Sequence, residues 1–161
     1  MTSLVACLVL SLCSVCVYHN SLDNEFVFDD HLAIVNNADT DPSTSYLDLW
    51  KHDIWGKDLT AHDSHRSYRP LLIVAFKILR HYFGLNPRPI RIASVICHAI
   101  SSILVYFLGL QVLSNWHVSF ASAILFSLHP VHVEVSEEQV FFYFPFLTLM
   151  VLFNVVRGSC G

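Results

Sequence analysis

The stretch IRIASVICHAISSILVYFLGLQVL, residues 90–113, decides the fold class of this chain. After Arg91 it runs for about 20 positions without a charged residue, which is the length that an α-helix needs to cross the hydrocarbon core of a bilayer. Its polar positions are His98, Ser101 and Ser102. A histidine inside a span is a candidate functional residue, and packing against the serines of its own helix is an equally good interpretation. We predict a transmembrane helix here.

The composition of the whole chain agrees with this prediction. Its 161 residues are 54% hydrophobic and only 14% charged, with a mean hydropathy of +0.52. Soluble domains carry about 25% charged residues, so we predict an all-α integral membrane protein. The net charge of -4 and the lack of a basic stripe give no reason to expect a nucleic-acid partner.

Three other apolar runs extend the membrane interpretation. Residues 4–18 form a run of about 15 residues, which is short for a span, so a signal peptide is the alternative to a signal-anchor or first transmembrane helix. We favour the helix, because no basic residue precedes the run and no A-x-A cleavage site precedes Tyr18. The other runs are residues 118–128 and 140–156. The expected organisation is a first span at 1–18, a polar loop at 19–91, three membrane segments within 92–157 and a tail at 158–161.

The polar loop contains enough aromatic and aliphatic residues to predict a folded segment rather than a disordered one. Residues 36–44 have the composition of turns. We expect a short helix at 45–50, with Leu47, Leu49 and Trp50 on its apolar side.

A second helix is expected at 68–85. Its apolar residues recur at helical spacing, and Pro70 suits the first turn. Lys77, Arg80 and His81 lie between the apolar positions and argue against a span. We therefore place this amphipathic helix along the membrane surface.

Two adjacent carboxylates, Asp29 and Asp30, follow the run Phe26, Val27 and Phe28 in this loop. Adjacent carboxylates repel each other, so a fold that holds them close tends to raise the pKa of one, which suits a group that accepts a proton. A solvated turn is the simpler interpretation of an isolated pair. The position just after a membrane segment favours a catalytic role.

Five blocks of sequence resemble the N-terminal region of the TMTC family, the transmembrane and TPR repeat-containing protein O-mannosyltransferases of the endoplasmic reticulum. They occur in the family's order and at similar spacing, over roughly residues 4–134. The blocks are FVFDD (26–30), AIVNN (33–37), HDIWG (52–56), SHRSYRPL (64–71) and HPVHVE (129–134).

The resemblance implies a partial GT-C-like multi-span domain with a large luminal loop after its first span. It implies transfer of mannose from dolichyl phosphate mannose to Ser or Thr hydroxyls of secretory-pathway proteins, chiefly cadherins. No tightly bound cofactor is expected, and the protein is expected in the endoplasmic reticulum membrane as a multi-pass protein. The N-terminus would be cytosolic and residues 19–91 luminal. The family's TPR array is expected to be absent from this chain.

The family's acidic pair in the first luminal loop matches Asp29 and Asp30. With the match, we expect Asp29 to be the catalytic base and Asp30 to help orient the acceptor. Arg66 and Arg69 are candidates for binding the donor phosphate, because a guanidinium pairs with phosphate oxygens. Arg69 could equally anchor the loop to the bilayer surface or to an acidic neighbour.

The block at 129–134 provides His129 and His132, for which we expect a structural or donor-binding role at the luminal boundary. With Glu134 they form an H-x-x-H-x-E pattern, but Pro130 disturbs the helix on which these histidines would share a face, so no metal site is predicted. After this block the family continues with a Gly-Arg-Ala motif, whereas this chain reads VSEEQVFF at 135–142.

Two other functions fit parts of the sequence. The first is a catalytically inactive, truncated membrane isoform that acts through partner binding. The second is a metal-dependent membrane hydrolase that uses His129, His132 and Glu134. The sequence leaves the oligomeric state open.

Overall fold

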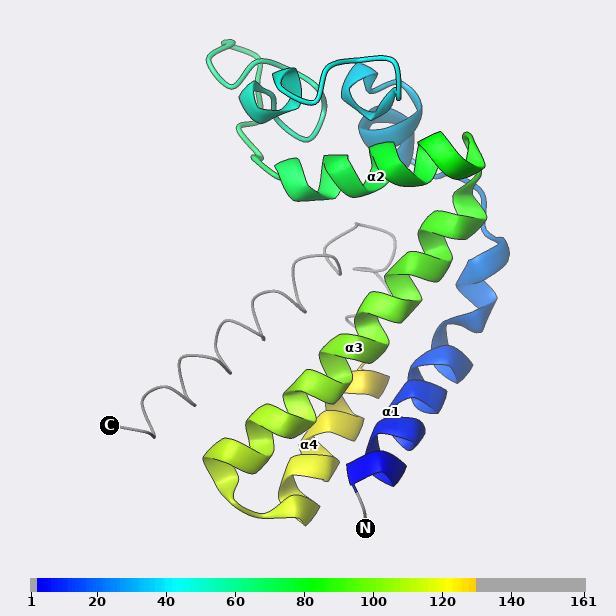
Figure 1. The fold of residues 1–161 in the computed structure, drawn as a ribbon, viewed down its shortest axis with the longest axis vertical. Coiled ribbons are helices and arrows are strands. Elements are labelled where there is room, and N and C mark those ends of the chain that lie inside the picture. The colour runs from blue at the N-terminus through cyan, green and yellow to red at the C-terminus, as the bar shows by residue number, and fades with distance from the viewer. Residues whose placement is uncertain (1–2, 130–161) are drawn as a thin grey trace. The chain divides into compact units, whose positions relative to one another are not determined.

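The computed structural model describes residues 3–129, which are mainly helical and contain no β-strand (Figure 1). These residues belong to two compact units. One, the helical unit, is described at residues 3–22 and 91–129; the other, the loop unit, is Asp23–Ile90. The prediction of an all-α fold is confirmed for these residues. The GT-C topology and the luminal position of the loop stay predictions.

Within residues 3–129, two helices are long and apolar enough to cross a membrane. Helix α1 (Ser3–Tyr18) continues into a 3₁₀ turn, η1 (His19–Asp23), which gives a helical segment of 21 residues. Helix α3 (Pro87–Leu113) has 27 residues. The first apolar run looked short in the sequence because the polar residues after Tyr18 were excluded from it.

Helix α4 (Trp116–Leu128) has 13 residues and is shorter than the roughly 20 needed for a span. It begins after Asn115, whose Oδ1 accepts hydrogen bonds from the backbone N–H groups of His117 and Val118 at 3.0 and 3.4 Å. This cap satisfies donors that the first helical turn leaves unpaired. The apolar run at 140–156 lies outside the described residues.

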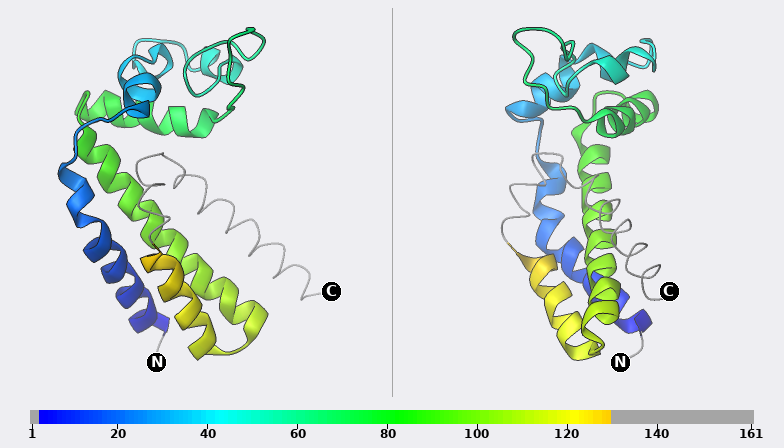
Figure 2. Two further views of the ribbon diagram at one scale, coloured as in Figure 1. Left: turned by 180° about the vertical axis from the view of Figure 1, so that it is seen from behind. Right: turned by 90° about the vertical axis from the view of Figure 1, so that its left-hand side faces the viewer.

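Small residues let α1 and α4 pack closely. The fully buried positions repeat every four residues, and all of them except Leu10 carry small side chains: Ala6, Leu10 and Ser14 in α1, and Ser119, Ala123 and Ser127 in α4. The Ser14 and Ser127 Oγ atoms lie 3.1 Å apart. Figures 1 and 2 show the two helices side by side. Small side chains at this spacing allow helix backbones to approach within a membrane.

His98 links α3 to α4. Its Nε2 lies 3.1 Å from the backbone oxygen of Ser127, and its ring stacks on Phe126 and meets Tyr18 edge to face. The hydroxyls of Ser101 and Ser102 donate to backbone oxygens one turn earlier in α3. The geometry therefore gives this histidine of α3 a contact between helices.

Gly109 marks a close approach of α3 to α4. A Cβ atom there would lie 3.0 Å from Ser119 Cβ and 3.1 Å from Ser119 Cα. Gly109→Ala should therefore lower the stability of the helical unit by about 1 kcal/mol or more, although alanine favours a helix. Thermal unfolding in detergent, followed by circular dichroism at 222 nm, measures the change. Adding Ser119→Gly should recover part of the loss; a Gly109→Ala variant more stable than wild type would show that the helices lie farther apart.

The loop unit consists of short helical turns packed on one longer helix. The turns are η2 (His31–Val35), η3 (Ala38–Thr40) and η4 (Asp48–Lys51), and the longer helix is α2 (Pro70–Phe83). The helix expected at 45–50 is replaced by the single turn η4. Leu49 is buried, with 1% of its surface exposed, while Leu47 and Trp50 are 76% and 46% exposed. A turn this short offers only one inward position, so the predicted three-residue apolar face was wrong.

The helix predicted at 68–85 is present as α2, with Pro70 in its first turn and Gly84 as its C-cap. Leu72, Ile73 and Phe76 form its buried side. Its exposed surface includes apolar residues such as Leu71, and its placement on the bilayer surface stays a prediction.

Two cations of α2 point into the loop rather than forming a water-facing stripe. Lys77 is fully buried, and its Nζ donates to Thr44 O and Thr44 Oγ1 at 2.8 and 2.7 Å and to Asp39 O at 3.3 Å. Arg80 donates to Thr40 Oγ1 at 2.7 Å. The sequence pattern assigned these cations to a polar surface, but they bind the turns that α2 supports.

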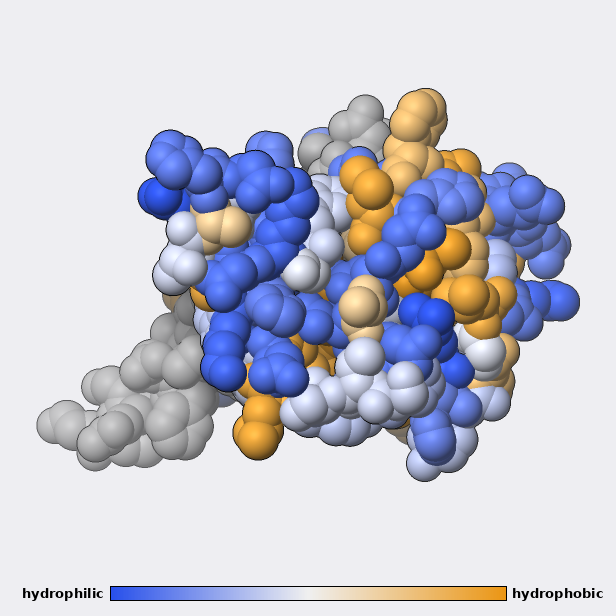
Figure 3. All heavy atoms as spheres, turned by 90° about the horizontal axis from the view of Figure 1, so that it is seen from above, coloured by the Kyte–Doolittle hydropathy of each residue, from blue (hydrophilic) through white to orange (hydrophobic). Residues whose placement is uncertain are grey.

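The surface seen from above in Figure 3 is largely hydrophilic, with hydrophobic residues clustered in one part of it. Among the loop residues, Phe28 is the most exposed large apolar side chain, at 92%.

Candidate functional site

The acidic pair does not follow a strand. Asp29 begins a helical turn that continues into η2, and Phe28 before it has a left-handed backbone with φ of +34°. Asp30 is buried, and its Oδ2 lies 3.3 Å from the backbone nitrogen of Val27, which donates to it. Asp29 is exposed. The fold therefore gives two neighbouring carboxylates different surroundings.

Asp29 lines a pocket with a volume of about 420 Å³. The pocket walls come from three segments of the loop unit. The lining residues are Asp29, Leu32 and Asn36 on one segment, Trp55 and Lys57 on the second, and Asp63 and His65 on the third. A pocket of this volume lies within the range that binds small molecules.

The second and third segments are joined through one buried carboxylate, that of Asp53, which is 1% exposed. Its Oδ1 accepts the backbone N–H groups of Trp55 and Lys57, both at 3.0 Å. Its Oδ2 accepts the Ser64 hydroxyl at 2.6 Å and the His65 N–H at 3.1 Å. At the rim, Lys57 Nζ forms an ion pair with Asp63 Oδ2 at 2.7 Å.

These hydrogen bonds determine the charge of Asp53. Burial acts to raise the pKa of this carboxyl, but the bonds from Ser64, Lys57, Trp55 and His65 favour the anion, and the pKa is lowered. A lowered folded pKa means that Asp53 contributes stability that is fully present above its unfolded pKa of about 3.9. That contribution is lost as the pH falls through the folded pKa. At neutral pH Asp53 is therefore a carboxylate anion.

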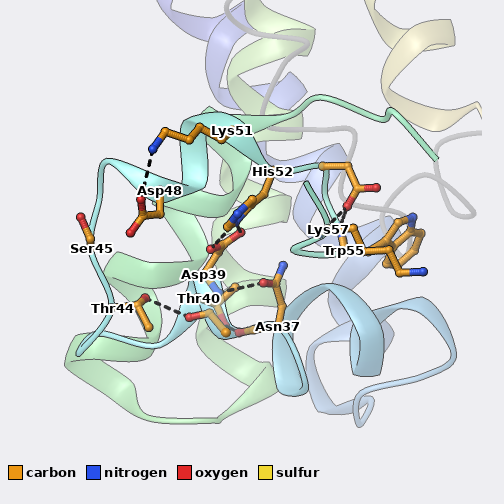
Figure 4. A network of polar contacts seen from close by, with 12 residues as sticks. Asn37, Asp39, Thr40, Thr44, Ser45, Asp48, Lys51, His52, Trp55 and Lys57 are labelled. Carbon is orange, nitrogen blue, oxygen red and sulfur yellow. Dashed lines mark hydrogen bonds and ion pairs between the residues drawn. The ribbon is translucent and has the colours of Figure 1, made fainter. Parts of the chain in front are cut away.

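Asn37 connects the first segment to the second. Its Nδ2 donates to Ile54 O, and its Oδ1 accepts from the Asp39 N–H, both at 2.9 Å. Figure 4 shows Asn37, Asp39 and His52 grouped together, with the Asp39 carboxylate facing the His52 ring. His52 Nδ1 lies 2.9 Å from Asp39 Oδ2. All three pocket segments are thus held by side chains that do not line the pocket.

Gly56 fits beside Asn37 because it has no side chain. Its φ is +75°, and a Cβ atom would lie 2.6 Å from Asn37 Oδ1. Gly84 has a similar φ of +67° but open space around it. Gly56→Ala should destabilise the loop unit by about 1 kcal/mol or more beyond the loss caused by Gly84→Ala, because only the former adds a steric clash to the backbone strain. Thermal unfolding of both variants measures the difference, and equal losses would show that Asn37 moves aside freely.

Strained backbone occurs next to the pocket. Phe28 and Arg66 have positive φ values of +34° and +56°, and each adjoins a residue that lines the pocket, Asp29 or His65. Non-glycine residues held in this conformation cluster at functional sites. The strain therefore favours the pocket as the functional part of the loop.

None of the predicted donor-binding residues within the described part of the chain lines the pocket. Arg66 is exposed and Arg69 precedes α2 as its N-cap, and neither lines the pocket. His129 is exposed at the end of α4, and His132 lies outside the described residues, as does Glu134. Among the described residues that line the pocket, Lys57 is the one with an ammonium group.

Sequence reasoning assigned no role to the other residues of the pocket. Trp55 and His65 stood within the blocks HDIWG and SHRSYRPL, which carried the resemblance, whereas Lys57 and Asp63 stood outside every block. Membership of these blocks was therefore the only sequence feature that pointed to some of the pocket residues.

Residues 3–129 contain no group of three His, Cys, Asp or Glu side chains that could hold a metal ion. The pocket instead combines carboxylates, an amide and an ammonium with an indole. Such side chains bind hydroxyl groups by hydrogen bonds and the apolar face of a ligand by contact with the ring. An exposed carboxylate such as that of Asp29 is a group that can accept a proton from a hydroxyl.

Curated proteins with similar sequences share one description. The chain is 38% identical to the human protein O-mannosyl-transferase TMTC4 over 142 residues, which are 79% of this chain and 19% of that protein. It is 40% identical to the mouse protein O-mannosyl-transferase TMTC1 over 119 residues, or 73% of this chain and 13% of that protein. It is 32% identical to the Caenorhabditis elegans protein O-mannosyl-transferase F38B6.6 over 130 residues, or 79% of this chain and 19% of that protein.

The chain thus spans less than one fifth of the length of these relatives. No protein-family model matches it, and no solved structure matches it.

Proposed function

Because the chain belongs to the TMTC family of protein O-mannosyl-transferases, we propose that its loop unit forms part of a site that transfers mannose to Ser or Thr hydroxyls. The observation that carries the proposal is the exposed carboxylate of Asp29 on a pocket of about 420 Å³. The donor we propose is dolichyl phosphate mannose, and the acceptors are secretory-pathway proteins such as cadherins. The protein would act in the endoplasmic reticulum membrane, with the loop unit in the lumen.

The proposed reaction is a single displacement with inversion at the anomeric carbon. The Asp29 carboxylate takes the proton of the acceptor hydroxyl while the hydroxyl oxygen bonds to that carbon. The bond from the anomeric carbon to the phosphate oxygen breaks, and dolichyl phosphate leaves with the electron pair. One base is sufficient, because a phosphate leaves without strong assistance from an acid.

Asp30 has a different part in this proposal. Its carboxylate is buried and accepts the Val27 N–H, so it supports the turn that presents Asp29. Its role in orienting the acceptor, which the resemblance implied, stays a prediction. The exposed position of Asp29 makes it the better candidate for contact with the substrate.

The donor phosphate needs a cation. Lys57 is the cation at the pocket, but its Nζ is paired with the Asp63 carboxylate, which repels a phosphate. Arg66 and Arg69 therefore stay candidates for this role, because a guanidinium pairs with two phosphate oxygens. The pocket itself is better suited to the neutral, hydroxyl-bearing part of a substrate.

A transfer assay tests the proposal. Microsomes from cells that express the protein from its gene receive radiolabelled dolichyl phosphate mannose and a recombinant cadherin domain. We expect more label on the cadherin domain than with microsomes from cells that do not express the protein. This result should be the same with and without a chelator of divalent cations. Loss of transfer with the chelator would show that the transfer itself requires a divalent cation. No transfer at all would favour the inactive isoform that binds a partner.

A further inference from the structure

Asp53 lines no part of the pocket, yet its carboxylate binds the backbone of three residues that do. We propose that Asp53 is a positioning residue for substrate binding: it fixes Trp55, Lys57 and His65 as one wall of the pocket. The inference rests on the proposed function for the reaction at this site. It adds which residue holds one wall of the pocket in place.

All the hydrogen bonds described for the Asp53 carboxylate are to residues 55, 57, 64 and 65. The group is buried, and both of its oxygens are occupied, each by two donors. Oδ1 organises the local turn from Asp53 to Lys57. Oδ2 reaches residues 64 and 65, which are 11 and 12 positions away in the sequence.

None of these four hydrogen bonds joins Asp53 to the segment that contains Asp29. Loss of the Asp53 carboxylate should therefore shift the wall that contacts the substrate and leave the proposed base in place. Displacements of about 1 Å in a site can lower activity by as much as 100-fold. A positioning role predicts that the apparent KM for the donor changes more than kcat.

A general loss of stability has a different kinetic signature. It lowers the fraction of folded protein, so the apparent kcat falls while the KM stays constant. Lys77→Met provides this comparison, because Lys77 is buried in the same unit but binds Thr44 and the Asp39 carbonyl rather than the pocket segments. Asp48→Asn is the neutral control, since Asp48 is exposed and pairs only loosely with Lys51, at 3.5 Å.

The experiment compares Asp53→Asn, Lys77→Met and Asp48→Asn with wild type in the microsomal transfer assay, at a temperature below the unfolding transition of every variant. We expect Asp53→Asn to raise the apparent KM for dolichyl phosphate mannose about 10-fold or more, because the displaced wall loses contacts that bind the ground state and the transition state alike. Lys77→Met should keep the wild-type KM, and Asp48→Asn should match wild type throughout. An unchanged KM in Asp53→Asn, with only kcat reduced, would overturn the positioning role.

A second measurement does not depend on activity. Hydrogen exchange in the purified protein should be faster at the backbone amides of Trp55, Lys57 and His65 in Asp53→Asn than in Lys77→Met. If wild type shows no transfer, the proposed function fails, while exchange still tests whether Asp53 holds this wall. Unchanged exchange at all three amides would overturn the inference even where transfer is observed.

Discussion

Asp29→Asn is expected to lower mannosyl transfer by about 10²- to 10⁴-fold, which is the usual contribution of a positioned general base. The amide has nearly the same size as the carboxylate but cannot accept the proton of the acceptor hydroxyl. Because Asp29 is exposed, the substitution should leave the unfolding temperature unchanged. The assay is label transfer from dolichyl phosphate mannose, with protein levels normalised by immunoblot.

The control for this variant is Asp48→Asn, which removes another exposed carboxylate of the loop unit, one that does not line the pocket. It should retain wild-type transfer. Transfer within a factor of about two of wild type in Asp29→Asn would remove Asp29 from the role of base. Reduced transfer in both variants would instead indicate that any loss of negative charge in the loop impairs the reaction.

Lys77→Met is expected to destabilise the loop unit by about 3 kcal/mol, the largest stability effect that we predict. Methionine fills the space of the aliphatic stem but cannot donate to Thr44 O, Thr44 Oγ1 or Asp39 O. The ammonium also lies 4.7 Å from the centre of the Tyr46 ring, a contact that methionine would lose. Thermal unfolding followed by near-ultraviolet circular dichroism measures the change in the purified protein.

Lys51→Met is the matched control, because Lys51 is exposed and its pair with Asp48 spans 3.5 Å. Surface pairs of this kind contribute at most about 1 kcal/mol, so its unfolding temperature should stay near that of wild type. Equal stability of the two variants would mean that the turns around Thr44 do not depend on α2 for their conformation.

The sequence predicted the parts of the fold that depend on local spacing. The long apolar run at 90–113 corresponds to α3, and the amphipathic pattern with Pro70 corresponds to α2. The burial of Lys77 was missed, because spacing reports which side of a helix is apolar but not what lies opposite its polar residues. Only the turns packed against α2 make the burial of an ammonium favourable, by supplying backbone and hydroxyl acceptors.

For the candidate site, too, the sequence predicted some features and only the folded structure showed the others. From the sequence alone it follows that the chain is rich in apolar helices, that a folded polar segment lies between them and that Asp29 and Asp30 are adjacent in it. The packing of the folded chain was needed to show that Asp29 is exposed on a pocket while Asp30 is buried. Folding also brings residues 53–57 and 64–65 together through the Asp53 carboxylate. The two kinds of information differ because hydrophobic periodicity records burial along one helix, whereas hydrogen bonds between segments distant in sequence follow no period and form only when the chain folds.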